Sequence, residues 1–335
     1  MKNIKFVITD YLHPDLKFEE EECKKMGVDF LYYQMRNAAP KELIEVCKNA
    51  DVILVDMAQF NKEVIHGLKN CKLLLRHGIG YDNIDVSACN EEGIAIGYYP
   101  KFCFIEVAEQ TIMLMMACLR KLIEQFQKVK SVTVHGYENQ MSVMPIHRLR
   151  GSTVGIVGFG QIGMLVYKML QGFGVNFLIC DPYLPEERKK ESNIQTCSFE
   201  DILRCSDMIT IHVPLKLKLS DTFHMFDTPQ FAIMKNSAIL INTSRGSVIN
   251  LEALNVALDK GEIAGAGLDV FEKEPPHPDF PLLKNPKVVL TPHMSWLSVE
   301  SVRDIRESYM DDVRRFLDKK GPKDQVNPQT QIRFY

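Results

Sequence analysis

The alternation of short apolar runs with charged amphipathic segments is the feature that most constrains the fold of this 335-residue chain. The runs are rich in Val, Ile and Leu and have the length of strands buried on both faces. They form two series, one on each side of Gly151: Ile4–Thr9, Val52–Val55, Leu73–Leu75 and Ile94–Ile96, then Thr153–Val157, Asn176–Cys180, Met208–Val213, Ala238–Asn242 and Val288–Thr291. Such alternation predicts a mostly parallel sheet covered by helices on both faces, and two series predict two doubly wound α/β domains.

Two helical segments mark the places where the predicted domains join. Apolar residues recur at helical spacing over Glu106–Lys128, and a second amphipathic helix is predicted over Ser298–Asp318. Two helices at the junctions indicate that the chain crosses from one domain to the other and returns. We therefore expect a flavodoxin-like domain of residues 1–105 plus 298–335, into which a Rossmann domain of residues 106–297 is inserted.

Composition excludes several classes of function. The net charge is −3 and no basic stripe is apparent, which disfavours binding to nucleic acid through phosphate neutralisation. The longest apolar run, Thr111–Leu119, cannot span a bilayer, and the apolar part of Met1–Asp10 is too short for a signal peptide. The nine cysteines contain no C-x-x-C pair and lie mostly in apolar runs. We expect buried thiols in a reducing cytoplasm, with no structural metal and no membrane partner.

A glycine fingerprint stands between a predicted strand and a predicted helix. Gly158 permits a tight turn, Gly160 lets the backbone approach a pyrophosphate, and Gly163 lets the helix pack against the strand. The helix N-terminus then offers the amides of Gln161 and Ile162 to the anion. This context predicts a dinucleotide-binding site.

An aspartate specifies which dinucleotide we expect. Asp181 ends the next strand, eighteen residues beyond Gly163, close to the position of a ribose-binding carboxylate. Its charge would repel a 2′-phosphate, and Pro182 and Tyr183 follow with no arginine to compensate. NAD is therefore favoured over NADP. The structural alternative is an ordinary turn with a solvated aspartate.

Arg245, Glu274 and His293 each occur in a distinctive short segment downstream of the fingerprint. A cation, a carboxylate and an imidazole are the groups needed to couple hydride transfer to proton transfer. Each has a structural alternative, since His293 could cap a helix, Glu274 could be a loop charge and Arg245 could form a structural pair. Their joint occurrence after a cofactor fingerprint favours the catalytic interpretation.

Together these segments resemble the D-isomer-specific 2-hydroxyacid dehydrogenase family along nearly the whole chain. Trp296 and the Asp10-Tyr11 and Pro14–Leu16 segments make the chain most similar to the branch that contains the C-terminal-binding-protein corepressors and bacterial phosphoglycerate or hydroxypyruvate dehydrogenase-like members. The other matching segments are Arg76–Asp85, Val107–Glu109, His212–Leu215, Asn242–Gly246, Gly265–Val270 and Thr291–His293.

The resemblance implies an NAD-dependent oxidoreductase that interconverts a D-2-hydroxy acid and its 2-oxo acid. His293 would give a proton to the carbonyl oxygen during reduction and take it back in the reverse direction. Glu274 would hydrogen-bond the imidazole, favour its protonated form and hold its orientation. Arg245 would bind the α-carboxylate and polarise the carbonyl.

The resemblance also implies further contacts. Ile79 and Gly80 would cradle the substrate carboxylate with their amides, and Arg76 would bind it too, with a solvated surface cation as the alternative. Trp296 would line the side-chain pocket, with core packing as an even rival; His77 is interpreted as a structural histidine. Further cofactor contacts are implied for Val213, Pro214, Thr222, Thr243, Ser244 and Asp269.

The chain departs from the family pattern in one loop, where the segment Lys216–Asp221 precedes Thr222 and lengthens a loop that borders the cofactor in the family. Glu274 argues against formate oxidation, for which relatives carry glutamine. Because the sequence ends at Tyr335, we expect no regulatory domain such as long phosphoglycerate dehydrogenases carry. The resemblance implies closure of a cleft between the domains and a homodimer with an arm around Ser131–Pro145. The non-enzyme alternative is a corepressor-like scaffold that senses NAD(H) and binds protein partners.

Overall fold

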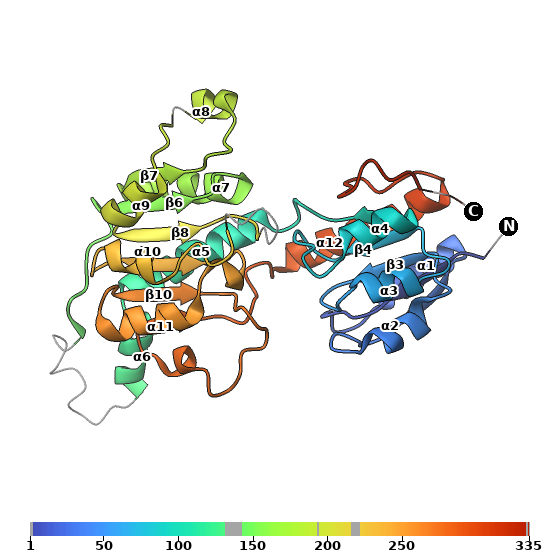
Figure 1. Ribbon diagram of the computed structural model, residues 1–335, viewed down its shortest axis with the longest axis horizontal. Helices are drawn as coiled ribbons and strands as arrows, with labels where there is room; N and C mark the ends of the chain where they lie inside the picture. The colour runs from blue at the N-terminus through green and yellow to red at the C-terminus, as the bar shows by residue number, and fades with distance from the viewer. Residues whose placement is uncertain (1–2, 131–142, 193, 216–221, 333, 335) are drawn as a thin grey trace. The chain divides into compact units, whose positions relative to one another are not determined.

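The computed structural model describes residues 3–130, 143–192, 194–215, 222–332 and 334, and the chain divides into two compact units. One unit comprises Met1–Cys103 and Ser298–Tyr335, and the other comprises Phe104–Leu297. Each unit contains its own parallel sheet with helices on both faces (Figure 1). The predicted fold class, two doubly wound α/β domains, is confirmed.

The sheet of the first unit has the strand order β2-β1-β3-β4-β5. This is the flavodoxin-like order, in which the chain starts near the middle of the sheet and winds in both directions. Its central strands are buried on both faces, which explains their continuous apolar sequences. The strands are β1 (Lys5–Ile8), β2 (Asp29–Tyr32), β3 (Val52–Val55), β4 (Leu73–Arg76) and β5 (Ala95–Gly97).

Two cores cover the faces of this sheet. Leu43, Ile65 and Cys89 come from helices that pack on the face containing Val7 and Ile53. These helices are α2 (Pro40–Cys47), α3 (Lys62–Gly67) and α4 (Val86–Glu92). The opposite face packs against α1 (Lys17–Met26) and α12 (Val299–Leu317). The predicted helix Ser298–Asp318 is confirmed, because its two end residues are the N-cap and C-cap of α12.

The sheet of the second unit has the strand order β11-β10-β9-β8-β6-β7. The first of these strands in sequence, β6, pairs with both β7 and β8, so the winding direction reverses at β6. A parallel bridge between Ile179 and Thr196 continues the sheet beyond β7, where the Rossmann order places its third strand. The strands are β6 (Thr153–Val157), β7 (Asn176–Cys180), β8 (Met208–Ile211), β9 (Ile239–Asn242), β10 (Gly265–Leu268) and β11 (Val288–Leu290).

Helices cover both faces of this second sheet. Residues of α5 (Phe104–Leu119) and α7 (Gln161–Leu170) pack in one core. Residues of α9 (Phe199–Cys205), α10 (Thr228–Ile233) and α11 (Leu251–Lys260) pack in the other. The described part also contains α6 (Leu122–Lys130) and α8 (Glu186–Ser192). No helix of the described residues is long and apolar enough to cross a membrane.

The predicted single helix Glu106–Lys128 is wrong. The chain forms α5 and α6 instead, with Lys121 between them at a φ of 53°, in the left-handed region. Helix α5 packs against the sheet up to Leu119, whereas no residue of α6 is buried. Apolar residues recur at helical spacing in both α5 and α6, although only α5 packs on the sheet. The sequence pattern therefore gives no indication of the break at Lys121.

Candidate active site

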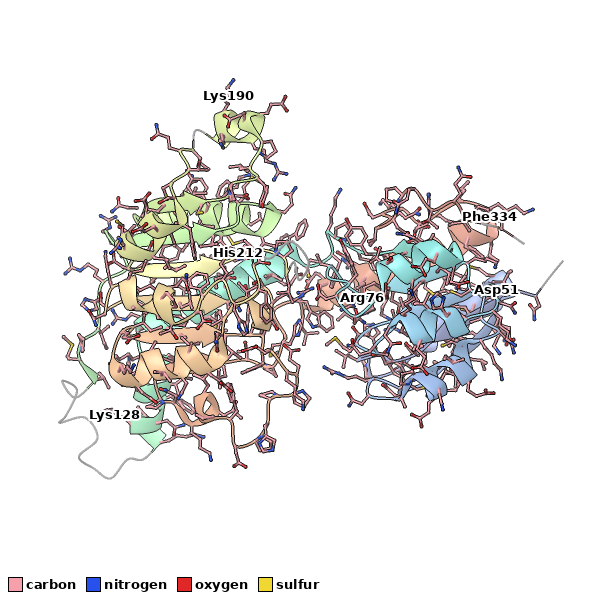
Figure 2. All side chains as sticks on the ribbon, in the orientation of Figure 1. Asp51, Arg76, Lys128, Lys190, His212 and Phe334 are labelled. Atoms are coloured by element: carbon pink, nitrogen blue, oxygen red, sulfur yellow. The ribbon has the colours of Figure 1, made fainter. Side chains whose placement is uncertain are left out.

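The glycine fingerprint forms a turn after β6, the strand at which the winding of the sheet reverses. Gly158 has a φ of 90°, in the region that favours glycine, and its amide donates a 2.9 Å bond to the carbonyl of Cys180. A Cβ atom on Gly158 would lie 2.6 Å from the carbonyl oxygen of His212, which follows β8 and is labelled in Figure 2. The turn thus lies at the switch point of the sheet, where open α/β sheets bind ligands.

The other two glycines of the fingerprint have different surroundings. A Cβ on Gly163 would lie 2.2 Å from the carbonyl oxygen of Gly158, so α7 can pack on the turn only if this residue is glycine. A Cβ on Gly160 would meet no atom within 4 Å. Gln161 and Ile162 form the first turn of α7, which carries no acidic side chain. The open backbone beside a helix N-terminus fits a pyrophosphate group.

Asp181 follows β7, and its carboxylate is hydrogen-bonded to the turn of the glycine fingerprint. Its Oδ2 accepts a 2.8 Å bond from the amide of Phe159, and its Oδ1 accepts a 3.0 Å bond from the amide of Tyr183. A carboxylate has about four acceptor positions, so these two bonds leave capacity for ribose hydroxyls. The predicted ribose ligand is therefore fixed beside the fingerprint.

The loop after β8 lies against this turn. A Cβ on Gly158 would lie 2.9 Å from Cγ1 of Val213. The buried Thr222 donates a 2.8 Å bond to the carbonyl of Pro214, which ties the two described ends of the loop together. Residues 216–221, the departure noted in the sequence, lie outside the described part of the chain.

Arg245 follows β9 on a turn that Asn242 organises. The buried Asn242 side chain accepts bonds from the amide (2.9 Å) and hydroxyl (2.8 Å) of Ser244, and donates a 2.9 Å bond to the carbonyl of Arg245. The Arg245 guanidinium donates a 2.9 Å bond to the carbonyl of Ser244. The role of Asn242 was not predicted. Its signal is an asparagine as the last residue of an apolar strand, where its side chain can bond nearby backbone groups.

Gly246 brings this turn against the loop after β10. A Cβ on Gly246 would lie 1.9 Å from the carbonyl carbon of Phe271 and 2.4 Å from the amide nitrogen of Glu272. Only glycine permits this approach of two backbones. The turn carrying Arg245 is therefore packed against the segment that leads to Glu274.

Glu274 and His293 are in direct contact. His293 Nδ1 lies 2.6 Å from Glu274 Oε2, and Glu274 Oε1 accepts a 3.0 Å bond from the amide of Phe271. The imidazole is 36% exposed and the carboxylate 17%. His293 has a φ of 51°, which is uncommon outside glycine. Of the three predicted catalytic residues, the structure thus brings Glu274 and His293 together, with a sheltered carboxylate and an accessible imidazole.

Asp269 is a fully buried carboxylate that holds the loop on both sides of His293. Its Oδ1 accepts bonds from the Thr291 hydroxyl (2.5 Å) and the Met294 amide (3.1 Å). Its Oδ2 accepts bonds from the amide (2.9 Å) and hydroxyl (2.5 Å) of Ser295. These four bonds match the usual acceptor capacity of a carboxylate. Asp269 therefore orients this loop, and its contact with a cofactor stays a prediction.

Two more predicted residues lie on these loops. Thr243 is buried, and its hydroxyl lies 2.9 Å from the hydroxyl of Thr111 in α5. Trp296 is half-buried beside the buried Ser295 and the exposed Leu297.

In the first unit, Arg76 ends β4 and its side chain is only 11% exposed (labelled in Figure 2). Its Nε donates a 3.2 Å bond to Asn83 Oδ1, and one terminal nitrogen lies 3.4 Å from Asp56 Oδ1. The same nitrogen donates to the carbonyl of His77. The alternative of a solvated surface cation is therefore wrong.

The loop after Arg76 contains a buried histidine and two glycines. His77 Nε2 lies 3.1 Å from Nε2 of the buried His13, so His77 is a buried, hydrogen-bonded histidine, and its structural role stays a prediction. Gly78 has a φ of 146°. Within the described residues, the amides of Ile79 and Gly80 donate no hydrogen bond, as the predicted carboxylate cradle requires.

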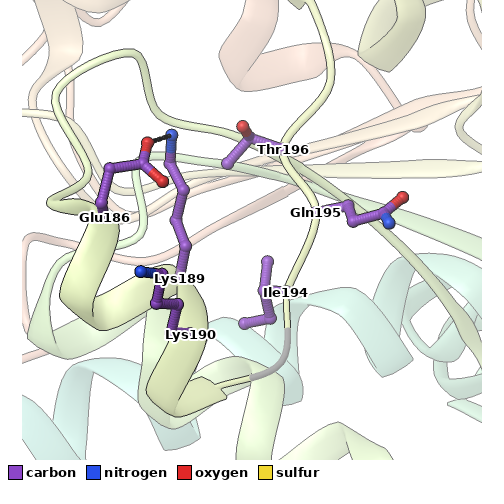
Figure 3. A pocket seen from close by; sticks show the side chains of 6 residues that line it. All are labelled: Glu186, Lys189, Lys190, Ile194, Gln195 and Thr196. Atoms are coloured by element: carbon purple, nitrogen blue, oxygen red, sulfur yellow. Dashed lines mark hydrogen bonds and ion pairs between the residues drawn. The ribbon is translucent and has the colours of Figure 1, made fainter.

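Two cavities of the second unit are lined by residues other than Arg245, Glu274 and His293. One, of about 490 Å³, is lined by α8 and the segment after it, where Glu186 and Lys189 form a 2.7 Å ion pair (Figure 3). The other, of about 810 Å³, is lined at the amino ends of strands by residues such as Met208, Ile239 and Gly265.

Comparison with known proteins gives consistent matches along the chain. The family described as D-isomer specific 2-hydroxyacid dehydrogenase, NAD binding domain, matches residues 112–295. The chain is 36% identical over 278 residues to a D-3-phosphoglycerate dehydrogenase of Archaeoglobus fulgidus, covering 82% of this chain and 51% of that protein. This chain thus spans about half the length of that relative.

Other relatives match over most of their length. A glyoxylate reductase of Korarchaeum cryptofilum is 35% identical over 288 residues, with 86% of each chain covered. Among solved structures, a D-lactate dehydrogenase of Aquifex aeolicus in complex with NAD and lactic acid aligns with a TM-score of 0.80 and 27% identity. That alignment covers 94% of this chain and 96% of the other.

Proposed function

Because this chain belongs to the D-isomer-specific 2-hydroxyacid dehydrogenase family, we propose that it is an NAD-dependent oxidoreductase that interconverts a D-2-hydroxy acid and its 2-oxo acid. The observation that carries this proposal is the 2.6 Å contact between His293 Nδ1 and Glu274 Oε2, in the same unit as the fingerprint and Asp181. A histidine oriented by a carboxylate is suited to move a proton at its other ring nitrogen.

The fingerprint and Asp181 would hold NAD. Gly158, Gly160 and Gly163, with the amides of Gln161 and Ile162, fit the pyrophosphate, and Asp181 fits the ribose hydroxyls. The further cofactor contacts proposed are those of Val213, Pro214, Thr222, Thr243, Ser244 and Asp269. When bound, NAD supplies the hydride acceptor or donor.

The hydrogen bonds of Glu274 support one arrangement of the protons on His293. An ionised carboxylate only accepts, and Glu274 already accepts the amide of Phe271 through Oε1. The imidazole Nδ1 therefore donates to Oε2, which leaves Nε2 to give or take the proton of the substrate oxygen. Glu274 stabilises the imidazolium that forms when Nε2 takes the proton from a hydroxy acid.

Arg245 would bind the α-carboxylate and polarise the carbonyl. A guanidinium presents donors in a planar fork that matches a carboxylate, and its fixed charge stabilises negative charge that develops on the oxygen. Arg76, with Ile79 and Gly80, is proposed as an anion site in the first unit, and Trp296 is proposed to select the substrate side chain.

The substrate test uses purified protein with NADH and a panel of 2-oxo acids: glyoxylate, hydroxypyruvate, pyruvate and longer apolar acids. The proposal expects oxidation of NADH with at least one of them. The product should have the D configuration for every acid except glyoxylate, whose product, glycolate, is achiral. Tight NADH binding without turnover on any acid would instead favour the scaffold that senses NAD(H) and binds protein partners.

We also propose a cytoplasmic homodimer. Helix α6 exposes Leu122, Ile123, Phe126 and Val129, each at least 43% exposed, and an apolar helix face of this kind indicates a protein interface. The free thiols are consistent with a reducing compartment. Most of the predicted arm, residues 131–142 of Ser131–Pro145, lies outside the described part. Light scattering of Phe126→Glu tests this: the variant should be monomeric, and an unchanged dimer would exclude α6 as the interface.

A further inference from the structure

Two neighbouring polar residues lie on α5, a helix whose buried residues are otherwise mostly apolar. Thr111 is fully buried and Gln110 is half-buried, among residues such as Val107 and Leu114. A buried polar side chain needs a hydrogen-bond partner, so each of these residues points to a specific contact. The partners are on two different catalytic loops.

Thr111 is bonded to the loop that carries Arg245. Its hydroxyl donates a 2.7 Å bond to the carbonyl of Val107 in the preceding turn. That bond uses its only proton, so the 2.9 Å contact with Thr243 must be donated by the Thr243 hydroxyl. Thr243 stands two residues before Arg245. The bond therefore fixes the start of the Arg245 turn to α5.

Gln110 is bonded to the loop that carries His293. Its Nε2 donates a 3.2 Å bond to the Thr291 hydroxyl, which in turn donates a 2.5 Å bond to Asp269 Oδ1. Thr291 stands two residues before His293, and Asp269 accepts the Met294 and Ser295 amides on the other side. Hydrogen bonds linked in series, as from Gln110 through Thr291 to Asp269, polarise and strengthen one another.

We propose that Gln110 and Thr111 are positioning residues of the active site, which hold the Arg245 loop and the His293 loop on one rigid helix. This inference rests on the proposed function of Arg245 and His293. Its physical basis is that catalytic groups tolerate little displacement, since an error of about 1 Å can reduce a rate about 100-fold. A 16-residue helix packed on the sheet is a stiffer support than the loops themselves.

The test replaces hydroxyl and amide groups without large changes of volume. Thr111→Val removes the acceptor of Thr243, and Thr111→Ser keeps it as the conservative rescue. Gln110→Leu removes the donor to Thr291. We expect Thr111→Val and Gln110→Leu to lower kcat about 10-fold to 100-fold while the Kd of NADH changes less than about threefold. KM for the 2-oxo acid should change less than about threefold in Gln110→Leu, because the His293 loop carries none of the proposed carboxylate ligands. Thr111→Ser should recover most of kcat.

Gln110→Glu replaces the amide with a carboxylate and keeps the size of the side chain. The Thr291 hydroxyl has one proton, so the new carboxylate and Asp269 would compete for it. We expect a larger loss of kcat than in Gln110→Leu. The matched control is Thr228→Val, which removes a hydroxyl bonded to Asp227 at the start of α10 in the same unit. Its kcat should equal that of the unmodified protein.

Trp296 gives a readout that does not need turnover. It is the only tryptophan of the chain and lies three residues after His293. If Gln110 orders this loop, acrylamide should quench Trp296 fluorescence faster in Gln110→Leu and Gln110→Glu, but not in Thr228→Val. Unchanged quenching together with unchanged kcat in both Gln110 variants would overturn the inference for Gln110. Unchanged kcat in Thr111→Val would overturn it for Thr111.

These readouts separate the two proposals. If the unmodified protein turns over no 2-oxo acid, the proposed function fails, and Trp296 quenching still decides whether Gln110 holds the loop. If Thr111→Val does not fold, the inference is tested through the variants of the half-buried Gln110, by their kcat and the quenching of their Trp296 fluorescence.

Discussion

Replacing Gly160 by alanine should weaken cofactor binding without destabilising the protein. The added Cβ would meet no protein atom within 4 Å, and φ is −71°, which alanine adopts without strain. The change in folding free energy should therefore stay within about 1 kcal/mol. The methyl group would instead occupy the space through which the backbone approaches the pyrophosphate.

The loss of affinity follows from the bonds between backbone amides and an anion. Each hydrogen bond to a charged group contributes about 1.5–3 kcal/mol, so loss of one should raise the Kd of NADH about 10-fold to 100-fold. The assay is a fluorescence titration with NADH, with thermal unfolding measured in parallel. Gly163→Ala is the matched control: its Cβ would lie 2.2 Å from the Gly158 carbonyl oxygen, so its Tm should fall. Unchanged NADH affinity in a stable Gly160→Ala protein would refute the assignment of this turn to the pyrophosphate.

Three other changes have definite expected outcomes. Glu274→Gln should lower kcat about 100-fold with NADH affinity preserved, because a neutral amide stabilises the imidazolium less; an unaltered pH–rate profile would contradict this. Gly246→Ala should destabilise the second unit by at least about 3 kcal/mol in denaturant unfolding, because its Cβ would lie 1.9 Å from the Phe271 carbonyl carbon. Burial, and then the charge of His77, lower the pKa of His13 from 6.5 to about 4. The unfolded chain therefore binds the proton first, so stability should decline by roughly 3 kcal/mol as the pH falls from 6.5 to 4, and His13→Gln should reduce that decline.

The features that sequence predicts well are local. The fingerprint turn is predicted from residues within one strand–turn–helix segment. Each of its glycines meets a different steric requirement: the tight turn, the approach to the pyrophosphate or the packing of the helix. Asp181 could be placed because β7 follows α7 at a fixed distance along the chain. Alternating strands and helices likewise determine the parallel sheets, because parallel neighbours need crossover connections.

The features that sequence misses depend on packing between distant segments. Strand β10 (Gly265–Leu268) contains two glycines, which disfavour a strand, yet Gly267 permits close packing, since a Cβ there would lie 2.9 Å from Cδ1 of Ile241 and 3.1 Å from Cβ of Leu114. Helix α5 ends at Leu119 although the amphipathic pattern continues. The bonds of Gln110 and Thr111 join α5 to loops more than a hundred residues away, so no local pattern reports them.

The most direct test of the account is the activity of His293→Ala measured beside its NADH affinity. The account predicts that reduction of the preferred 2-oxo acid is abolished while the Kd of NADH stays within about threefold of the unmodified protein, because His293 acts on the substrate proton and the fingerprint holds the cofactor. Appreciable residual turnover, or loss of NADH binding together with activity, would contradict the assignment of His293 as the acid–base group.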